Sequence, residues 1–357
     1  MNRFVSFLKN NRATVAMLLF ILVFYLAIVA GESAVRKTPV KNLTPTPAFS
    51  QKTQAPQASQ ADEFKQKEEL FEKNVTKRPG LMVVISLSFI AALAAGLFLD
   101  ARWFWKAQHG KSWLAGGYPH EPVAWDWTHV LQAAVFMFFA ESVFLILETV
   151  YCLVFGIKEI PKDFLLMANS LLRDTVAALF IILMVRRMGH KLSALGLTAR
   201  DFFKNMLRGV AGYIAVLPAL FLTLIIISAA TKIISYEPPP QNVVQIYLKK
   251  SSDPYLLFFT IFVAGAGPLI EEIFFRGFAY NAFRQKFGVV PGMLVTSAIF
   301  AAFHLNLVAF LPIFVLGMML CYLYEETGSL VPSMTAHMLH NLLMINFTLG
   351  FKSIVGS

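Results

Sequence analysis

The stretch Gly267–Tyr280, GPLIEEIFFRGFAY, decides how the rest of this chain is interpreted. It places Glu271, Glu272 and Arg276 at the end of an apolar run that begins near Tyr255. A charged side chain at the centre of a membrane helix costs about 2.5–3.5 kcal/mol on insertion-based scales. Three such groups kept together in an apolar run indicate that the protein uses them. The alternative is a charge cluster that anchors the helix at the membrane edge.

Helical spacing divides the three charges into two roles. Glu272 precedes Arg276 by four residues, which is the favoured order for an ion pair on one helix face. Glu271 is rotated by about 100° from Glu272 and can face elsewhere. We therefore expect Arg276 to pair with Glu272, which leaves Glu271 available for chemistry.

Two further polar patterns follow on separate apolar segments. The sequence FAAFH ends at His304, and the sequence HMLHN runs from His337 to Asn341. Four-residue spacing places His337 and Asn341 on one helix face, and Phe300 and His304 on one face of another helix. A carboxylate, two imidazoles and an amide on three apolar helices can converge on one buried catalytic site.

These three patterns resemble the motifs of the CPBP family of intramembrane proteases, written EExxxR, FxxxH and HxxxN. The family includes the CAAX prenyl endopeptidases and bacterial bacteriocin-processing and self-immunity proteins. All three motifs occur here in the family's order, and FRGF and TGSLVPSMTAH around them also resemble the family. One such motif is a weak signal, but three in order over residues 255–347 are a strong one.

The resemblance implies a catalytic role for four residues. Peptide hydrolysis needs an activated water, a group that stabilises the oxyanion and a proton donor for the leaving amine. The family pattern assigns water activation to Glu271 and His304 and the oxyanion hole to His337 and Asn341. Glu272 and Arg276 would then support the site.

A zinc version of the same site is the alternative. One carboxylate and two histidines, here Glu271, His304 and His337, could hold Zn²⁺ with an open position for water. The sequence has no HExxH helix, so ligand spacing alone does not decide between the two. We favour direct catalysis by the glutamate, with zinc absent or inhibitory.

Composition predicts an all-α protein that crosses the membrane many times. The chain of 357 residues is 57% hydrophobic and only 15% charged, which excludes an ordinary soluble domain. We predict eight to nine spans, at about 13–30, 81–99, 130–156, 164–185, 209–230, 255–280, 290–309, 311–324 and 331–350. The sixth of these would end in the glutamate motif.

Four regions follow from this pattern. Residues 1–31 are expected to form a signal anchor or first span, and residues 32–79 a polar flexible linker with a short charged helix at about 61–75. Residues 80–160 would hold further spans and a tryptophan-rich interfacial loop. Residues 161–357 would form the protease-like domain, with its motif core at 255–347.

Other polar residues are expected to be structural. The five tryptophans are typical of a membrane-interface belt or a re-entrant loop, and His109, His120 and His129 are expected to be interfacial. Glu141 and Glu148 lie seven residues apart on one helix face, where they would join helices or line a cavity. His340 is expected to be packed and hydrogen-bonded, and Phe275 and Phe300 to be cavity walls. The cysteines Cys152 and Cys321 indicate neither a disulfide framework nor a metal site.

The net charge of +10 fits a membrane surface better than nucleic acid, because the basic residues lie in loops between spans. The bilayer and a peptide or lipidated protein within it are therefore the expected partners. The distribution of basic residues predicts a cytoplasmic N-terminus, in a plasma or inner membrane. Two non-enzymatic alternatives remain, a transporter and a membrane scaffold; the sequence shows no internal repeat that would favour a transporter.

Overall fold

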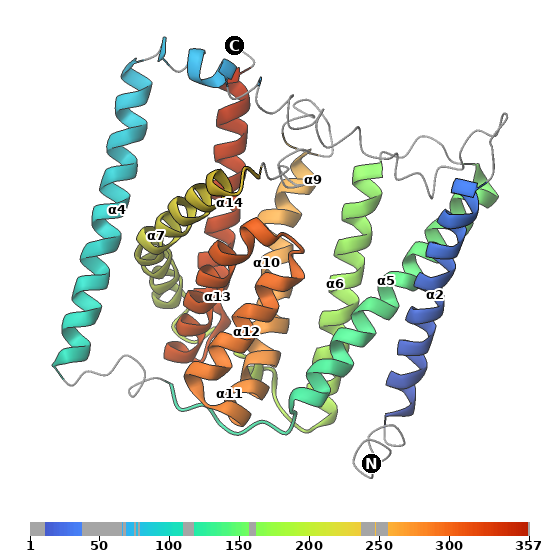
Figure 1. Ribbon diagram of the computed structural model, residues 1–357. Helices are drawn as coiled ribbons and strands as arrows, with labels where there is room; N and C mark the ends of the chain where they lie inside the picture. Colours follow the sequence, from blue (N-terminus) through green and yellow to red (C-terminus); the bar gives the residue numbers. More distant parts are fainter. Residues whose placement is uncertain are drawn as a thin grey trace. The chain divides into compact units, whose positions relative to one another are not determined.

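The computed structural model describes residues 11–37, 66, 69–74, 76–77, 79–109, 118–156, 162–236, 247 and 256–355. Over these residues the chain forms helices and no strand (Figure 1), which confirms the predicted all-α class. Most of the polar segment 32–79, the residue Trp113 and the proline-rich loop at 237–240 lie outside the described residues.

α-Helices make up most of the described chain. They are α2 (Arg12–Lys37), α4 (Pro79–Gln108), α5 (Trp127–Phe155), α6 (Lys162–Arg187), α7 (Phe202–Ile233), α9 (Leu256–Ile261), α10 (Gly267–Glu272), α11 (Asn281–Phe287), α12 (Val289–Phe303), α13 (Leu307–Thr327) and α14 (Leu330–Val355). Short helical segments complete them: η1 (Leu192–Leu195) has 3₁₀ geometry, whereas η2 (Phe262–Ala266) and η3 (Ile273–Tyr280) are π-helical.

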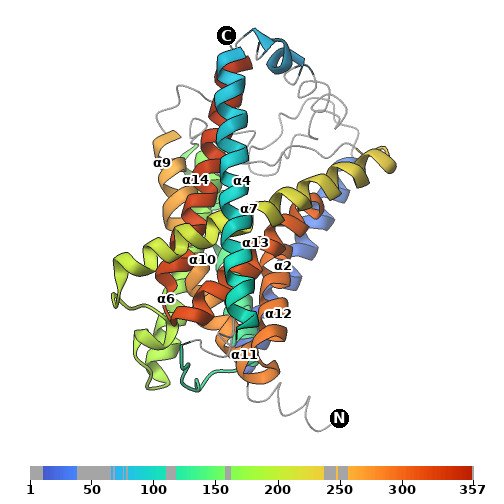
Figure 2. The same ribbon diagram turned by 90° about the vertical axis from the view of Figure 1, so that its left-hand side faces the viewer.

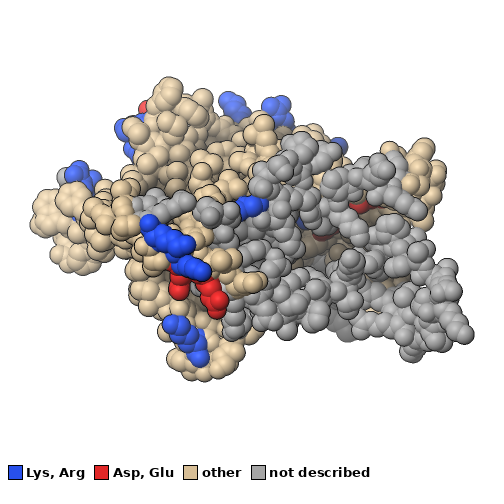
Figure 3. All heavy atoms as spheres, turned by 90° about the horizontal axis from the view of Figure 1, so that it is seen from above, with Lys and Arg blue, Asp and Glu red and all other residues tan. Residues whose placement is uncertain are grey.

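Seven helical stretches are long and apolar enough to cross a membrane, so the chain is a polytopic membrane protein. They are 12–30, 82–108, 127–155, 167–187, 202–233, 256–287 and 307–327. The predicted spans at 290–309 and 331–350 correspond to α12 and α14, which are not among these seven. The apolar helix α12 has only 15 residues, and α14 carries the polar motif of His337. On the face seen in Figure 3, most of the described surface is uncharged.

The chain divides into two compact units, which are described separately. Unit 1 comprises residues 1–54 and 127–184, and unit 2 comprises residues 55–126 and 185–357. The four regions predicted from the sequence were divided by composition and motif rather than by contacts, and they stay a prediction.

Polar pairs join α5 to α6 in unit 1. Glu141 lies 3.3 Å from Nη1 of Arg173, whose Nε lies 2.8 Å from the carboxylate of Asp174. Glu148 accepts a hydrogen bond from the amide of Asn169. The predicted helix-joining role of Glu141 and Glu148 is therefore confirmed. Such bonds hold helices together where lipid provides no hydrophobic driving force between them.

The core of unit 2 lies among α7, α13 and α14. It contains Tyr213, Val216, Leu220, Leu316, Met319, Leu320, Leu323 and Ala336. The hydroxyl of Tyr213 lies 3.2 Å from Nδ1 of His340, so His340 is packed and hydrogen-bonded as expected. Figure 2 shows α7 crossing behind α4, and these two helices are in contact. The helix α14, which carries the His337 motif, is thus part of this core.

The glutamate motif lies at the middle of its span, not at the end as predicted. The helical stretch from Leu256 to Phe287 is continuous over 32 residues, and Glu271 and Glu272 are its sixteenth and seventeenth. The sequence prediction ended the span too early because Arg276, Asn281 and Arg284 interrupt its apolar pattern. In the structure the helix continues because all eight residues of the π-helical segment η3 are buried inside unit 2. π-Helical turns are rare and are frequently found at functional sites.

Two side chains in the segment Tyr118–Asp126 are enclosed within unit 2. This corrects the prediction that Trp125 and His120 lie at the membrane interface. Trp125 is fully buried, stacks on Phe278 and donates a hydrogen bond from its indole N–H to the carbonyl of Phe278 at 2.9 Å. His120 lies 3.3 Å from the carboxylate of Glu325, and burial lowers the pKa of His120 below its usual value. By contrast, Trp105 and Trp127 are exposed, as an interfacial position requires.

Close packing at Gly277 gives a stability prediction. A Cβ atom there would lie 2.7 Å from the carbonyl oxygen of Leu195 in η1. We expect Gly277→Ala to destabilise the protein by about 1–3 kcal/mol, because the backbone of η1 would have to move. Thermal unfolding in detergent measures the change. The matched control is Gly350→Ala, since a Cβ at Gly350 meets nothing within 4 Å, and equal melting temperatures for the two variants would contradict the prediction.

Candidate active site

A fully buried ion pair lies at the centre of the site. Nη1 of Arg276 donates a hydrogen bond to Oε1 of Glu272 at 2.6 Å, and both side chains are 0% exposed. Arg276 also donates from Nη2 to the carbonyl of Gly317 at 3.3 Å, and its guanidinium carbon lies 4.4 Å from the ring centre of Phe300. The pairing expected from the i,i+4 spacing is therefore confirmed, with α13 and α12 enclosing it.

His337 lies between the two glutamates. Its Nδ1 is 3.0 Å from Oε1 of Glu272, and its Nε2 is 3.7 Å from Oε2 of Glu271. Oε1 of Glu272 accepts from Arg276 and, as a carboxylate oxygen, can only accept from His337 as well. Nδ1 of His337 therefore carries the hydrogen and donates it to Glu272. In the neutral imidazole, Nε2 is then an acceptor facing Glu271. The contact of His337 with Glu272 is one that the sequence did not predict.

Glu271 and Glu272 differ sharply in environment. The side chain of Glu271 is 34% exposed, whereas that of Glu272 is fully enclosed. Adjacent positions on one helix explain the difference, because they face directions about 100° apart. The predicted division between a paired and an accessible glutamate therefore matches the geometry.

Phe300 connects the two catalytic histidine candidates. This phenylalanine is 1% exposed, and its ring lies edge-on to His304 at 4.9 Å and to His337 at 5.6 Å between ring centres. Nδ1 of His304 is 2.8 Å from the carbonyl of Phe300, at the C-terminal end of α12, and the residue is exposed. Phe300 is thus packed between the two histidines, and its predicted role as a cavity wall stays a prediction.

Asn341 contacts the first half of the glutamate span. Its side-chain amide donates a hydrogen bond to the carbonyl of Val263 in η2 at 2.8 Å. A π-helical turn changes the backbone pairing of a helix, and this side-chain bond ties α14 to that turn. One N–H of the Asn341 amide is thus engaged, and the amide carries a second.

The metal alternative has no ligand set in this geometry. Among the described residues, no three His, Cys, Asp or Glu side chains lie close enough to share a metal ion. Glu271, His304 and His337 therefore do not fit a zinc centre as placed here. The zinc version of the site stays a prediction, which a chelator experiment tests below.

A second buried carboxylate was missed by the sequence reasoning. Glu325 is 2% exposed and accepts hydrogen bonds from Nε and Nη2 of Arg284 at 2.8 and 3.0 Å and from the hydroxyl of Tyr280 at 3.0 Å. These bonds fasten the end of the glutamate span to α13. In the sequence Glu325 looks like a span boundary, and its partners lie too far away along the chain to be identified from spacing.

Fold and site together define a polytopic membrane protein with a buried Glu–Arg–His cluster inside its helix bundle. Residues 253–343 match the sequence model of the family described as type II CAAX prenyl endopeptidase Rce1-like. The match includes every motif residue from Glu271 to Asn341, and it supports the resemblance of this segment to the CPBP family of intramembrane proteases. Comparisons with curated proteins and with solved structures found no match.

Proposed function

We propose that this chain is an intramembrane endopeptidase in which Glu271 acts as the general base. One observation carries the proposal: the accessible Glu271 lies beside His337 and next to the buried Glu272–Arg276 pair, at the midpoint of a membrane span. Ionisable groups in such a position are expensive and mark function. The family match to residues 253–343 supports the same reaction class.

The proposed reaction begins with a water molecule held by Glu271 and His304. Glu271 takes a proton from this water as the water oxygen bonds to the carbonyl carbon of the scissile peptide, and the carbonyl electron pair moves onto its oxygen. His337 and Asn341 donate hydrogen bonds to the resulting oxyanion. When the intermediate collapses, the C–N bond breaks and the leaving amine takes a proton from the Glu271–His304 pair. The products are a carboxylate and an amine.

The position of His337 suits the proposed oxyanion role. Its Nδ1 faces Glu272 at 3.0 Å, so Nε2 is the nitrogen that remains for an oxyanion. This nitrogen donates a hydrogen bond only when both ring nitrogens carry a hydrogen, and the proposed step therefore uses a doubly protonated His337.

The proposed substrates are membrane-associated proteins, either prenylated CAAX-type proteins or leader peptides. We further propose a plasma or inner membrane, with the N-terminus in the cytoplasm. Within unit 2, basic residues lie at the C-terminal end of α4 (Lys106), at the end of α6 (Arg186, Arg187) and in α11 (Arg284, Lys286). The positive-inside rule would place these residues on the cytoplasmic side.

Cleavage of a quenched fluorescent peptide panel, farnesylated and unmodified, tests the function. The purified full-length protein is expected to cleave at least one class in the presence of a chelator, and His304→Ala is expected to lower kcat/KM about 100-fold or more. Activity that is lost in chelator and restored by Zn²⁺ would replace the glutamate mechanism with the zinc version. Wild-type activity in both His304→Ala and Glu271→Ala would overturn the proposal and favour a scaffold.

A further inference from the structure

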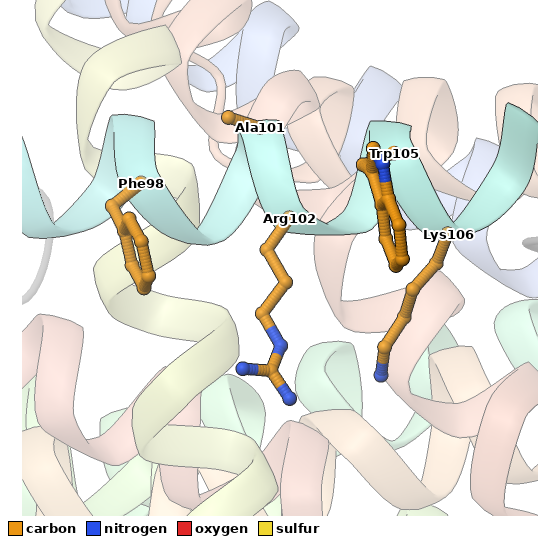
Figure 4. A pocket seen from close by; sticks show the side chains of 5 residues that line it. All are labelled: Phe98, Ala101, Arg102, Trp105 and Lys106. Atoms are coloured by element: carbon orange, nitrogen blue, oxygen red, sulfur yellow. The ribbon is translucent and has the colours of Figure 1, made fainter.

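A pocket on α4 lies outside the catalytic cluster and outside the matched family segment. It has a volume of about 390 Å³ and is lined by Phe98, Ala101, Arg102, Trp105 and Lys106. Figure 4 shows the side chains of Phe98, Arg102, Trp105 and Lys106 extending from one side of the helix. Their spacing of three and four residues explains this common face.

The pocket carries two positive charges and no acidic lining residue. Among the described residues, neither Arg102 nor Lys106 has an ion-pair or hydrogen-bond partner within unit 2. The nearest acid along the helix, Asp100, is rotated by about 200° from Arg102 and faces the other side of α4. Two neighbouring cations without a partner in the described part of unit 2, near the end of a membrane span, are suited to bind an anionic ligand.

Apolar surface continues from the two cations along α4. Phe98 is 67% exposed and Trp105 is 59% exposed, and Leu97 and Ile90 are also exposed nearer the middle of the span. The span ends at Gln108, so Arg102 lies about 9 Å from its end. A phosphate headgroup at this depth, with acyl chains along the apolar side chains, matches both the charge and the hydrophobic surface.

We propose that Arg102 and Lys106 form a binding site for the phosphate headgroup of an anionic phospholipid, with Phe98 and Trp105 contacting the glycerol backbone and acyl chains. This site is independent of the proposed protease activity. It would cover a helix that packs on α7 and is otherwise largely exposed within unit 2.

Equilibrium binding of fluorescent phosphatidylglycerol to the full-length protein in detergent tests the site, with unlabelled phosphatidylcholine as competitor. Each basic residue near a membrane surface contributes roughly a factor of five in affinity. The double variant R102Q/K106Q is therefore expected to bind phosphatidylglycerol about 30-fold more weakly. Circular dichroism checks that this variant keeps its helical fold, as expected because Arg102 is exposed, Lys106 is only half-buried, and neither has a partner within the described part of unit 2.

The matched control is K73Q/K77Q, which removes the same charge from exposed lysines four residues apart before the other end of α4. It is expected to change binding less than about threefold, because these lysines are not part of the pocket. Equal losses in the two double variants, or equal binding of phosphatidylcholine and phosphatidylglycerol by the wild type, would overturn the proposal. Displacement of the lipid by inorganic phosphate at the same concentration as the lipid would also overturn it, since the acyl chains would then contribute nothing.

Discussion

Glu271→Gln is expected to lower peptide cleavage about 100- to 10,000-fold, the range that general acid–base groups contribute. Glutamine has nearly the same shape as glutamate but does not accept a proton from water at neutral pH. The side chain of Glu271 is 34% exposed and is not the partner of Arg276, so the folded structure should change little. Single-turnover cleavage of the best peptide from the panel measures the loss.

The control for this substitution is Glu121→Gln, which removes an exposed carboxylate from the segment Tyr118–Asp126. Its cleavage rate and melting temperature should match those of the wild type. A Glu271→Gln protein that cleaves at more than about a tenth of the wild-type rate would exclude Glu271 as the general base. A large drop in its melting temperature would instead indicate a structural role.

Arg276→Met is expected to destabilise the protein by about 3–5 kcal/mol, the cost of leaving one member of a buried ion pair without its partner. Glu272 would remain fully buried, with His337 as a remaining donor at 3.0 Å. The substitution also removes the hydrogen bond to the Gly317 carbonyl and the contact with the Phe300 ring. The melting temperature in detergent, followed by circular dichroism, should fall clearly.

The double variant E272Q/R276M separates charge from packing. It removes both charges while keeping similar side-chain volumes, so it should recover much of the stability that Arg276→Met loses. The Nδ1–H of His337 can still donate to the glutamine oxygen. If the double variant is as unstable as the sum of the two single variants, the ion pair contributes no coupling, and Arg276 acts through packing alone.

Much of this architecture is local and could be read from the sequence. Apolar runs predict membrane helices because every backbone polar group in lipid must be paired within its own segment. The i,i+4 spacing of Glu272 and Arg276 predicts their ion pair because neighbouring turns of one helix bring the two side chains together. The exposure difference between Glu271 and Glu272 follows from the same helical geometry.

Other features depend on which helices are neighbours, which spacing along one helix does not encode. His337 is 65 residues from Glu272, so only the packing of α14 against the glutamate span places it between the two carboxylates. Buried partners also reversed expectations: Trp125 and His120 look interfacial by composition, but contacts with Phe278 and Glu325 bury them. The motifs and membrane helices were thus determined by the sequence through local helical geometry. The tertiary structure decided how their charges are partnered, because a buried charge is stabilised only by partners that packing brings to it.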